Sequence, residues 1–324
     1  MKKRKRKKLL SLLLKVSFSF LLVLLVLEKI NTRKLSELVK TADYKYFALS
    51  FLMIVMAQIF GALRMRYNLN AAEFKVSRTY SIGMYFLGTL FNIVLPGGIG
   101  GDGYRAYYFH KRFRFPWQKT LMAILRGRSS GLLFLCVFLI ACAFFYKDNL
   151  AIIPYIDYVL IASAILIFPA YTVLTKYLLK ENLKVQIGGM KYSFISQVFF
   201  LLATVAILEG IGSPDKMVGY IFVFLIANIV AVIPVSFGGI GLREFTYVTL
   251  AGYIGLNSDI GVATSILYYL VYTSVAFLGF IPYAFLRKMD LNELRYQRRM
   301  KLSKYTVVED SPEQIEAKNA YAGD

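Results

Sequence analysis

Apolar stretches of about 20 residues, the length needed to cross a bilayer, recur along this whole chain. A soluble domain of 324 residues would not need so many, and 57% of the residues are hydrophobic. We therefore expect an all-α polytopic membrane protein with about eight transmembrane helices. The candidate helices cover residues 9–29, 44–63, 79–96, 120–146, 153–175, 192–211, 217–235 and 262–286.

A glycine-rich motif occurs twice, each time at the end of an apolar run. Residues 92–105 read NIVLPGGIGGDGYR, and residues 228–245 read NIVAVIPVSFGGIGLREF. The segment that follows the first motif, 104–115, is too basic to span a membrane, and its counterpart 243–256 is too short. We therefore predict that each motif is the tip of a re-entrant hairpin, which enters the membrane and leaves on the same side.

The distribution of lysine and arginine supports this topology. A formal charge of +20 would suggest a nucleic-acid partner in a soluble protein, but here the positive-inside rule explains it better, so we expect no nucleic acid. With the N-terminus inside, the expected cytoplasmic segments hold 26 lysines and arginines, and the external segments hold 7. We therefore expect a multi-pass cell-membrane protein with both termini in the cytoplasm.

The repeated motif implies a repeated architecture. Half one, 9–146, is predicted as helix, helix, hairpin and helix starting inside, and half two, 153–288, repeats this order starting outside. The result is an inverted-topology repeat in which two opposed re-entrant hairpins meet near the middle of the membrane. Residues 1–304 then form a single transmembrane domain, and the polar, acidic residues 305–324 form a disordered cytoplasmic tail.

The tips carry the residue types of an anion site. Pro-Gly-Gly at 96–98 ends one helix, and Asp102 can cap the next. The new helix N-terminus would direct N–H groups and positive dipole toward the membrane interior, with Arg105 beside it. Residues 238–241 and Arg243 repeat this design from the other side. Since arginine binds phosphate through a bidentate fork, a phosphate group is the expected ligand.

Structural alternatives remain open for the same residues. The glycines can instead allow close helix packing, with the tip arginines paired to Asp102 or Glu244. An arginine inside a membrane costs about 2.5–3.5 kcal/mol even on insertion scales, which favours a functional role. Arg126 and Arg128, at the start of the helix after the first hairpin, are either functional or a pair that extends to the membrane interface.

An intramembrane enzyme is the less favoured alternative. Ser236 lies near glycines, but a serine nucleophile needs a base. The only histidine, His110, lies in the basic stretch of the other half, and a single histidine excludes a multi-histidine metal site within this chain. The two cysteines share one apolar run without metal-ligand spacing. We therefore expect no catalytic residue, no metal and no cofactor.

These motifs carry a resemblance to a known family. The patterns N-x-x-LPGG-x-GGD-x-x-R, a later R-x-x-GL helix and P-x-S-x-GGIGLRE resemble the transmembrane flippase domain of the lysylphosphatidylglycerol synthase/flippase family, over about residues 9–290. The resemblance implies translocation, between leaflets, of an anionic or aminoacylated phospholipid or of a polyprenyl-phosphate-linked lipid. Larger members add a soluble aminoacyl-transferase domain. This sequence ends where that domain would begin, so we expect no lysyl transfer.

The resemblance and the tip chemistry together define the candidate site. The RGR doublet leaves open which of its two arginines matches the family's arginine. The candidate substrate-binding residues are Asp102, Arg105, Arg126, Arg128, Ser236, Arg243 and Glu244, and the hairpin-tip residues are Pro96, Gly97, Gly98, Gly100, Gly101, Pro234, Gly238, Gly239 and Gly241.

Two other functions fit the same frame. One is a small-solute or ion transporter, and the other is a membrane partner of a lipid-modifying synthase or glycosyltransferase. A lateral opening toward the bilayer would distinguish a lipid transporter from a small-solute transporter, because only a lipid keeps its tails in the membrane. The expected partners are the bilayer and a phospholipid or lipid-linked substrate, and the oligomeric state is not predicted.

Overall fold

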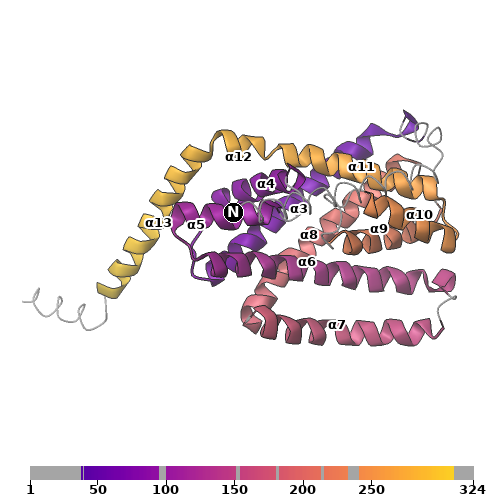
Figure 1. Cartoon of the computed structure of the whole chain (residues 1–324), viewed down its shortest axis with the longest axis horizontal. Coiled ribbons are helices and arrows are strands. Elements are labelled where there is room, and N and C mark those ends of the chain that lie inside the picture. Colours follow the sequence, from indigo (N-terminus) through magenta and orange to yellow (C-terminus); the bar gives the residue numbers. More distant parts are fainter. Residues whose placement is uncertain are drawn as a thin grey trace, which may run out of the picture.

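A computed structural model describes residues 38, 40–94, 100–150, 154–179, 182–212, 215–232 and 241–309 of the chain. Within these ranges the chain is helical and contains no strand, so the all-α prediction is confirmed there (Figure 1). The helix predicted over 9–29, residues 95–99 and 233–240 of the two glycine motifs and most of the predicted tail lie outside the described residues.

The described helices include one for each predicted span from 44–63 to 262–286, and also α13 (Leu286–Glu309), which was not predicted. They are α3 (Tyr44–Ala71), α4 (Arg78–Val94), α5 (Gly100–Phe113), α6 (Trp117–Phe145), the short 3-10 helix η1 (Lys147–Leu150), α7 (Ile156–Leu179), α8 (Leu183–Gly210), α9 (Met217–Ala231), α10 (Leu242–Tyr253), α11 (Ser258–Phe277), α12 (Phe280–Ala284) and α13 (Leu286–Glu309). In this part of the chain, five segments are long and apolar enough to cross a membrane: α3, α6, α7, α8, and α11 together with α12.

The helices on either side of each glycine motif are shorter than these spans. α4 has 17 residues and α9 has 15. At 1.5 Å per residue they extend about 25 Å and about 22 Å, less than the ~30 Å of a hydrocarbon core. The pair α4–α5 lies toward one end of the long axis of the bundle, and the pair α9–α10 lies toward the other (Figure 1).

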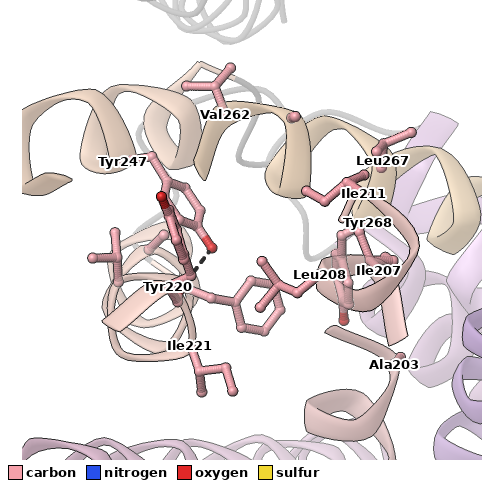
Figure 2. Close-up of a cluster of buried hydrophobic side chains, with 14 of the residues drawn as sticks. Ala203, Ile207, Leu208, Ile211, Tyr220, Ile221, Tyr247, Val262, Leu267 and Tyr268 are labelled. Carbon is pink, nitrogen blue, oxygen red and sulfur yellow. Dashed lines mark hydrogen bonds between the residues drawn. The ribbon is translucent and has the colours of Figure 1, made fainter. Parts of the chain in front are cut away.

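Each of these helix pairs has its own hydrophobic core. Around α9 and α10, buried side chains from α8 and α11 pack together, and the Tyr247 hydroxyl donates to the Tyr220 carbonyl at 3.3 Å (Figure 2). Around α4 and α5, a second cluster includes Met84, Leu87 and Phe109. The long helix α11 contacts both α3 and α4, and so connects the two halves.

Two helices lie at the margins of the bundle. α7 runs alongside α6, and most of its surface is exposed, as expected for a helix that faces lipid (Figure 1). α13 points away from the bundle and is held by two buried carboxylates, Asp290 and Glu293. It continues to Glu309, so the first five residues of the predicted tail are helical.

Candidate functional site

A polar cavity of about 190 Å³ lies among α3, α4, α5 and α6, and α8 and α11 each contribute one residue to its wall. Three arginines and one aspartate contribute to its wall, so its charged groups sum to a positive charge. Its lining residues are Gln58, Gly61, Arg64, Met65, Tyr85, Thr89, Asn92, Asp102, Arg105, Ala123, Ile124, Gly127, Arg128, Phe200 and Tyr272.

Asp102 joins two of these arginines. Its Oδ1 accepts from Arg105 Nη1 at 2.6 Å, and its Oδ2 accepts from Arg128 Nε. Asp102 and Arg105 are buried, whereas the side chain of Arg128 is 37% exposed. Three of the predicted site residues therefore meet at one point, and Arg128 is the member of the RGR doublet that lines the cavity.

Arg105 uses every nitrogen of its guanidinium within the protein. Besides its bond to Asp102, it donates from Nε to the Met84 carbonyl at 3.3 Å and from Nη2 to the Tyr85 carbonyl at 2.6 Å. Its Nη2 also lies 3.5 Å from the Thr89 hydroxyl. The guanidinium thus binds two backbone carbonyls near the middle of α4. In this geometry Arg105 is paired with Asp102, which is the structural alternative that the sequence left open for this arginine.

Two glycines make that contact possible. A Cβ on Gly88 would overlap the guanidinium of Arg105, and a Cβ on Gly101 would overlap the carbonyl of Gly88. The Gly101 N–H donates to Asn92 Oδ1 at 2.8 Å, which joins the end of α4 to the start of α5. Gly101 is therefore a packing residue here, and Gly100 begins α5.

Arg64 of α3 is a site residue that the sequence analysis missed, because the candidate helix was predicted to end at residue 63. It is 9% exposed, and its Nη1 donates to Ser193 Oγ of α8 at 3.2 Å. Its guanidinium lies against Gly127 and Gly131 of α6, where side chains would crowd it. No carboxylate among the described residues forms an ion pair with Arg64. The spacing of these glycines, four apart on one face of α6, was the available signal.

An apolar groove begins where the cavity ends. It has a volume of about 490 Å³ and runs between α6 and α7, and six of its lining residues are leucines. Arg64 and Arg128 line both the cavity and the groove. The leucines are Leu125, Leu132, Leu135, Leu174, Leu178 and Leu179. Leu174 and Leu178 are more than half exposed, so the groove opens on the outer, apolar side of the bundle.

Arg126 lies apart from this junction. Its Nη2 donates to the Leu179 carbonyl at the end of α7, 3.1 Å away. It therefore connects α6 to α7 and does not line the cavity or the groove.

The second glycine motif differs from the first. Glu244 accepts from the Gly241 N–H at 2.8 Å and from Ser265 Oγ at 2.7 Å, so it caps α10 and binds α11 rather than pairing with Arg243. Gly241 has φ +81°, a conformation that favours glycine. The buried Nε of Arg243 has no hydrogen-bond partner, and no carboxylate in the described ranges forms an ion pair with Arg243.

Several predicted residues are not placed. Ser236 and the tip residues Pro96, Gly97, Gly98, Pro234, Gly238 and Gly239 lie outside the described ranges. In the part of the chain that the structure describes, no group of three or more histidine, cysteine or acidic side chains is arranged to hold a metal ion.

Long apolar helices around a buried, positively charged cavity define a multi-pass membrane protein with an internal polar site. The chain belongs to the family described as the lysylphosphatidylglycerol synthase TM region, whose model matches residues 12–279. The resemblance drawn from the glycine motifs is thereby confirmed. A search of curated proteins found no match.

Proposed function

We propose that this protein is a lipid translocase, which moves an anionic or aminoacylated phospholipid, or a polyprenyl-phosphate-linked lipid, between leaflets. The observation that carries the proposal is the junction at Arg64 and Arg128. A positively charged cavity and a leucine-lined groove meet there and share these two side chains. A molecule that fills both spaces needs a negatively charged head and an apolar tail, which is the composition of an anionic lipid.

In this proposal the headgroup phosphate binds between Arg64 and Arg128, while an acyl chain follows the groove between α6 and α7. Arg64 is the stronger candidate ligand, because it is buried without a carboxylate partner and its guanidinium matches phosphate geometry. Arg128 adds charge from the junction's exposed side. Arg105 and Asp102 hold α5 in position and set the charge around the ligand.

The groove also separates the lipid proposal from the small-solute alternative. A small polar solute would make no favourable contact with the six leucines beside the cavity. A lipid tail would pack against them and remain in contact with the bilayer through the opening. A partner role beside a synthase would not require a charged cavity that continues into a lateral groove.

We further propose that the pairs α4–α5 and α9–α10 are re-entrant hairpins within an inverted repeat, with both termini on the cytoplasmic side of the cell membrane. Their shortness and their positions at opposite ends of the bundle support this (Figure 1). We also propose transport without covalent chemistry, because an arginine side chain offers no acceptor for a proton and Asp102 is ion-paired with two of the cavity arginines.

The test is transport of fluorescent lipids in proteoliposomes. Headgroup-labelled phosphatidylglycerol, lysyl-phosphatidylglycerol and phosphatidylcholine are compared for the wild type, Arg64→Gln and Arg128→Gln. Hydrogen bonds to charged groups contribute about 1.5–3 kcal/mol, so Arg64→Gln should slow transport of the anionic lipid roughly tenfold or more. Arg78→Gln, which removes an exposed charge outside the cavity, is the matched control. Unchanged transport in both cavity variants would exclude this site.

A further inference from the structure

A second groove lies at the end of the bundle where α13 leaves it. It has a volume of about 970 Å³ and lies between α5 on one side and α12 and α13 on the other. Four tyrosines contribute to its wall. Its lining residues are Tyr104, Tyr107, Tyr108, Lys111, Arg112, Tyr283, Ala284, Leu286, Arg287 and Asp290.

This groove uses a different face of α5 from the central cavity. Tyr104, Tyr107, Tyr108 and Lys111 follow the spacing i, i+3, i+4 and i+7, which places them on one side of a helix. Asp102 and Arg105 project from another side, into the cavity. The ring of Tyr104 stacks on Phe91 of α4, with ring centroids 4.1 Å apart. α5 therefore separates two sites of different composition.

The negative charge of Asp290, the one carboxylate that lines the groove, is balanced by partners within the protein. Asp290 accepts hydrogen bonds from Tyr80 at 2.9 Å and Tyr108 at 2.7 Å, and it forms an ion pair with Arg112 Nε at 2.9 Å. Its charge and its acceptor oxygens are thus used to anchor α13. Asp290 itself is buried, with 5% of its surface exposed.

Two cations in the same groove have no carboxylate partner. Neither Lys111 nor Arg287 forms an ion pair among the described residues, and both are exposed. The ammonium of Lys111 lies 5.7 Å from the ring centroid of Tyr107. The groove therefore offers two uncompensated positive charges beside phenol hydroxyls, which together suit a phosphate group.

The position of α12 identifies the source of that phosphate. α12 ends the apolar segment Ser258–Ala284, so the groove begins where this span leaves the hydrocarbon. Phe280, Ile281 and Phe285 are more than half exposed beside the groove. Tyrosines are enriched at the level of lipid headgroups, and exposed apolar side chains at a membrane boundary contact acyl chains. These features favour a membrane lipid over a soluble anion as the occupant.

We propose that this groove binds the phosphate-bearing headgroup of an anionic lipid, separately from the central cavity. The choice of a lipid rests on the proposed function. The groove would hold a lipid at the headgroup level of the leaflet near α13, before entry into the cavity or after release from it.

The test uses local fluorescence quenching. The only tryptophan, Trp117, is changed to Phe, and Tyr107→Trp introduces a reporter in the groove. The protein is reconstituted in phosphatidylcholine vesicles that contain increasing fractions of brominated phosphatidylglycerol or brominated phosphatidylcholine. Stronger quenching by the brominated phosphatidylglycerol is expected. In the same background, Lys111→Gln and Arg287→Gln should each weaken this preference about fivefold, as expected for one cation near a lipid surface.

The control removes the same number of charges outside the groove. Lys119→Gln with Lys288→Gln changes two exposed lysines at the same end of the bundle and should leave the preference intact. Equal quenching by both lipids, or a preference kept without Lys111 and Arg287, would overturn the proposal. Displacement of the brominated lipid by excess inorganic phosphate would overturn the choice of a lipid. Quenching reports binding in the groove and not transport. A protein that transports lipid normally but shows no preference for the brominated phosphatidylglycerol would contradict this proposal and leave the translocase proposal standing.

Discussion

Asp102 of α5 forms an ion pair with Arg128 of α6, and through its other oxygen it holds the buried Arg105. Asp102→Asn would leave Arg105 without its counter-ion in a buried position. Breaking a buried pair from one side costs about 3–5 kcal/mol, so the melting temperature of the purified protein should fall substantially. Asp157→Asn provides the comparison, since its pair with Lys147 is roughly half exposed and should contribute less than about 1 kcal/mol. Equal melting of the two variants would contradict the assigned role.

Arg105→Lys should also reduce stability. Lysine keeps the charge, but its single nitrogen cannot reach Asp102 and two carbonyls of α4 together. We expect a lower melting temperature, with lipid transport falling in proportion to the folded protein. A variant that melts like the wild type but no longer transports would instead make Arg105 a direct ligand of the substrate.

Arg243→Gln, unlike Arg105→Lys, should not reduce the stability of the protein. Its buried Nε has no partner, so its loss removes an uncompensated charge from a membrane environment. The melting temperature should stay the same or rise. If the charge serves the substrate, transport of an anionic lipid falls while the fold is kept. Full transport by this variant in the proteoliposome assay would exclude Arg243 from the transport route.

Glu293 should make stability depend on pH. Burial raises the pKa of this carboxyl above its ordinary value of 4.5, although hydrogen bonds from Ser77 oppose the shift. The folded state therefore holds the proton more tightly than the unfolded chain does. This contribution to stability is complete below about pH 4.5 and is lost as the pH rises through the raised pKa. The difference in melting temperature between the wild type and Glu293→Gln should change across that range, and a difference independent of pH would contradict it.

The proposed topology predicts opposite labelling of two engineered cysteines. Lys119 is exposed near the start of α6, and Tyr253 is exposed at the end of α10. In a chain with Cys136 and Cys142 changed to serine, a membrane-impermeant maleimide should label Lys119→Cys from the cytoplasmic face and Tyr253→Cys from the external face. Labelling of both from one face would rule out the inverted arrangement.

Hydropathy located the described helices well and their ends poorly. The helix predicted over 192–211 begins instead at Leu183, where Asn182 caps it by accepting from the Lys184 N–H. The helix predicted to end at residue 63 continues to Ala71. In both cases the helix extends beyond the apolar stretch into a polar region. Hydropathy reports the environment of a residue, whereas capping and backbone hydrogen bonds decide where a helix ends.

The charged site was only partly predictable for a related reason. Asp102, Arg105 and Arg128 stood out because they belong to the glycine motif or the helix after it. Arg64 did not, because a cation just after an apolar run is normally a sign of a loop. Its burial depends on Gly127 and Gly131 of α6, which are more than 60 residues away in sequence. The repeat also suggested equal roles for the two tips, but Glu244 caps its own helix.

The contact between Gly88 and Gly101 also bears on how the protein can move. With no space for even a methyl group between them, and with Arg105 bound to the carbonyls of α4, these two helices have no room to slide past each other. A rearrangement that admits the proposed lipid must then carry α4 and α5 together as one rigid body. The hinges for such a motion belong in the non-helical connections before and after the pair, at residues 74–77 and 114–116.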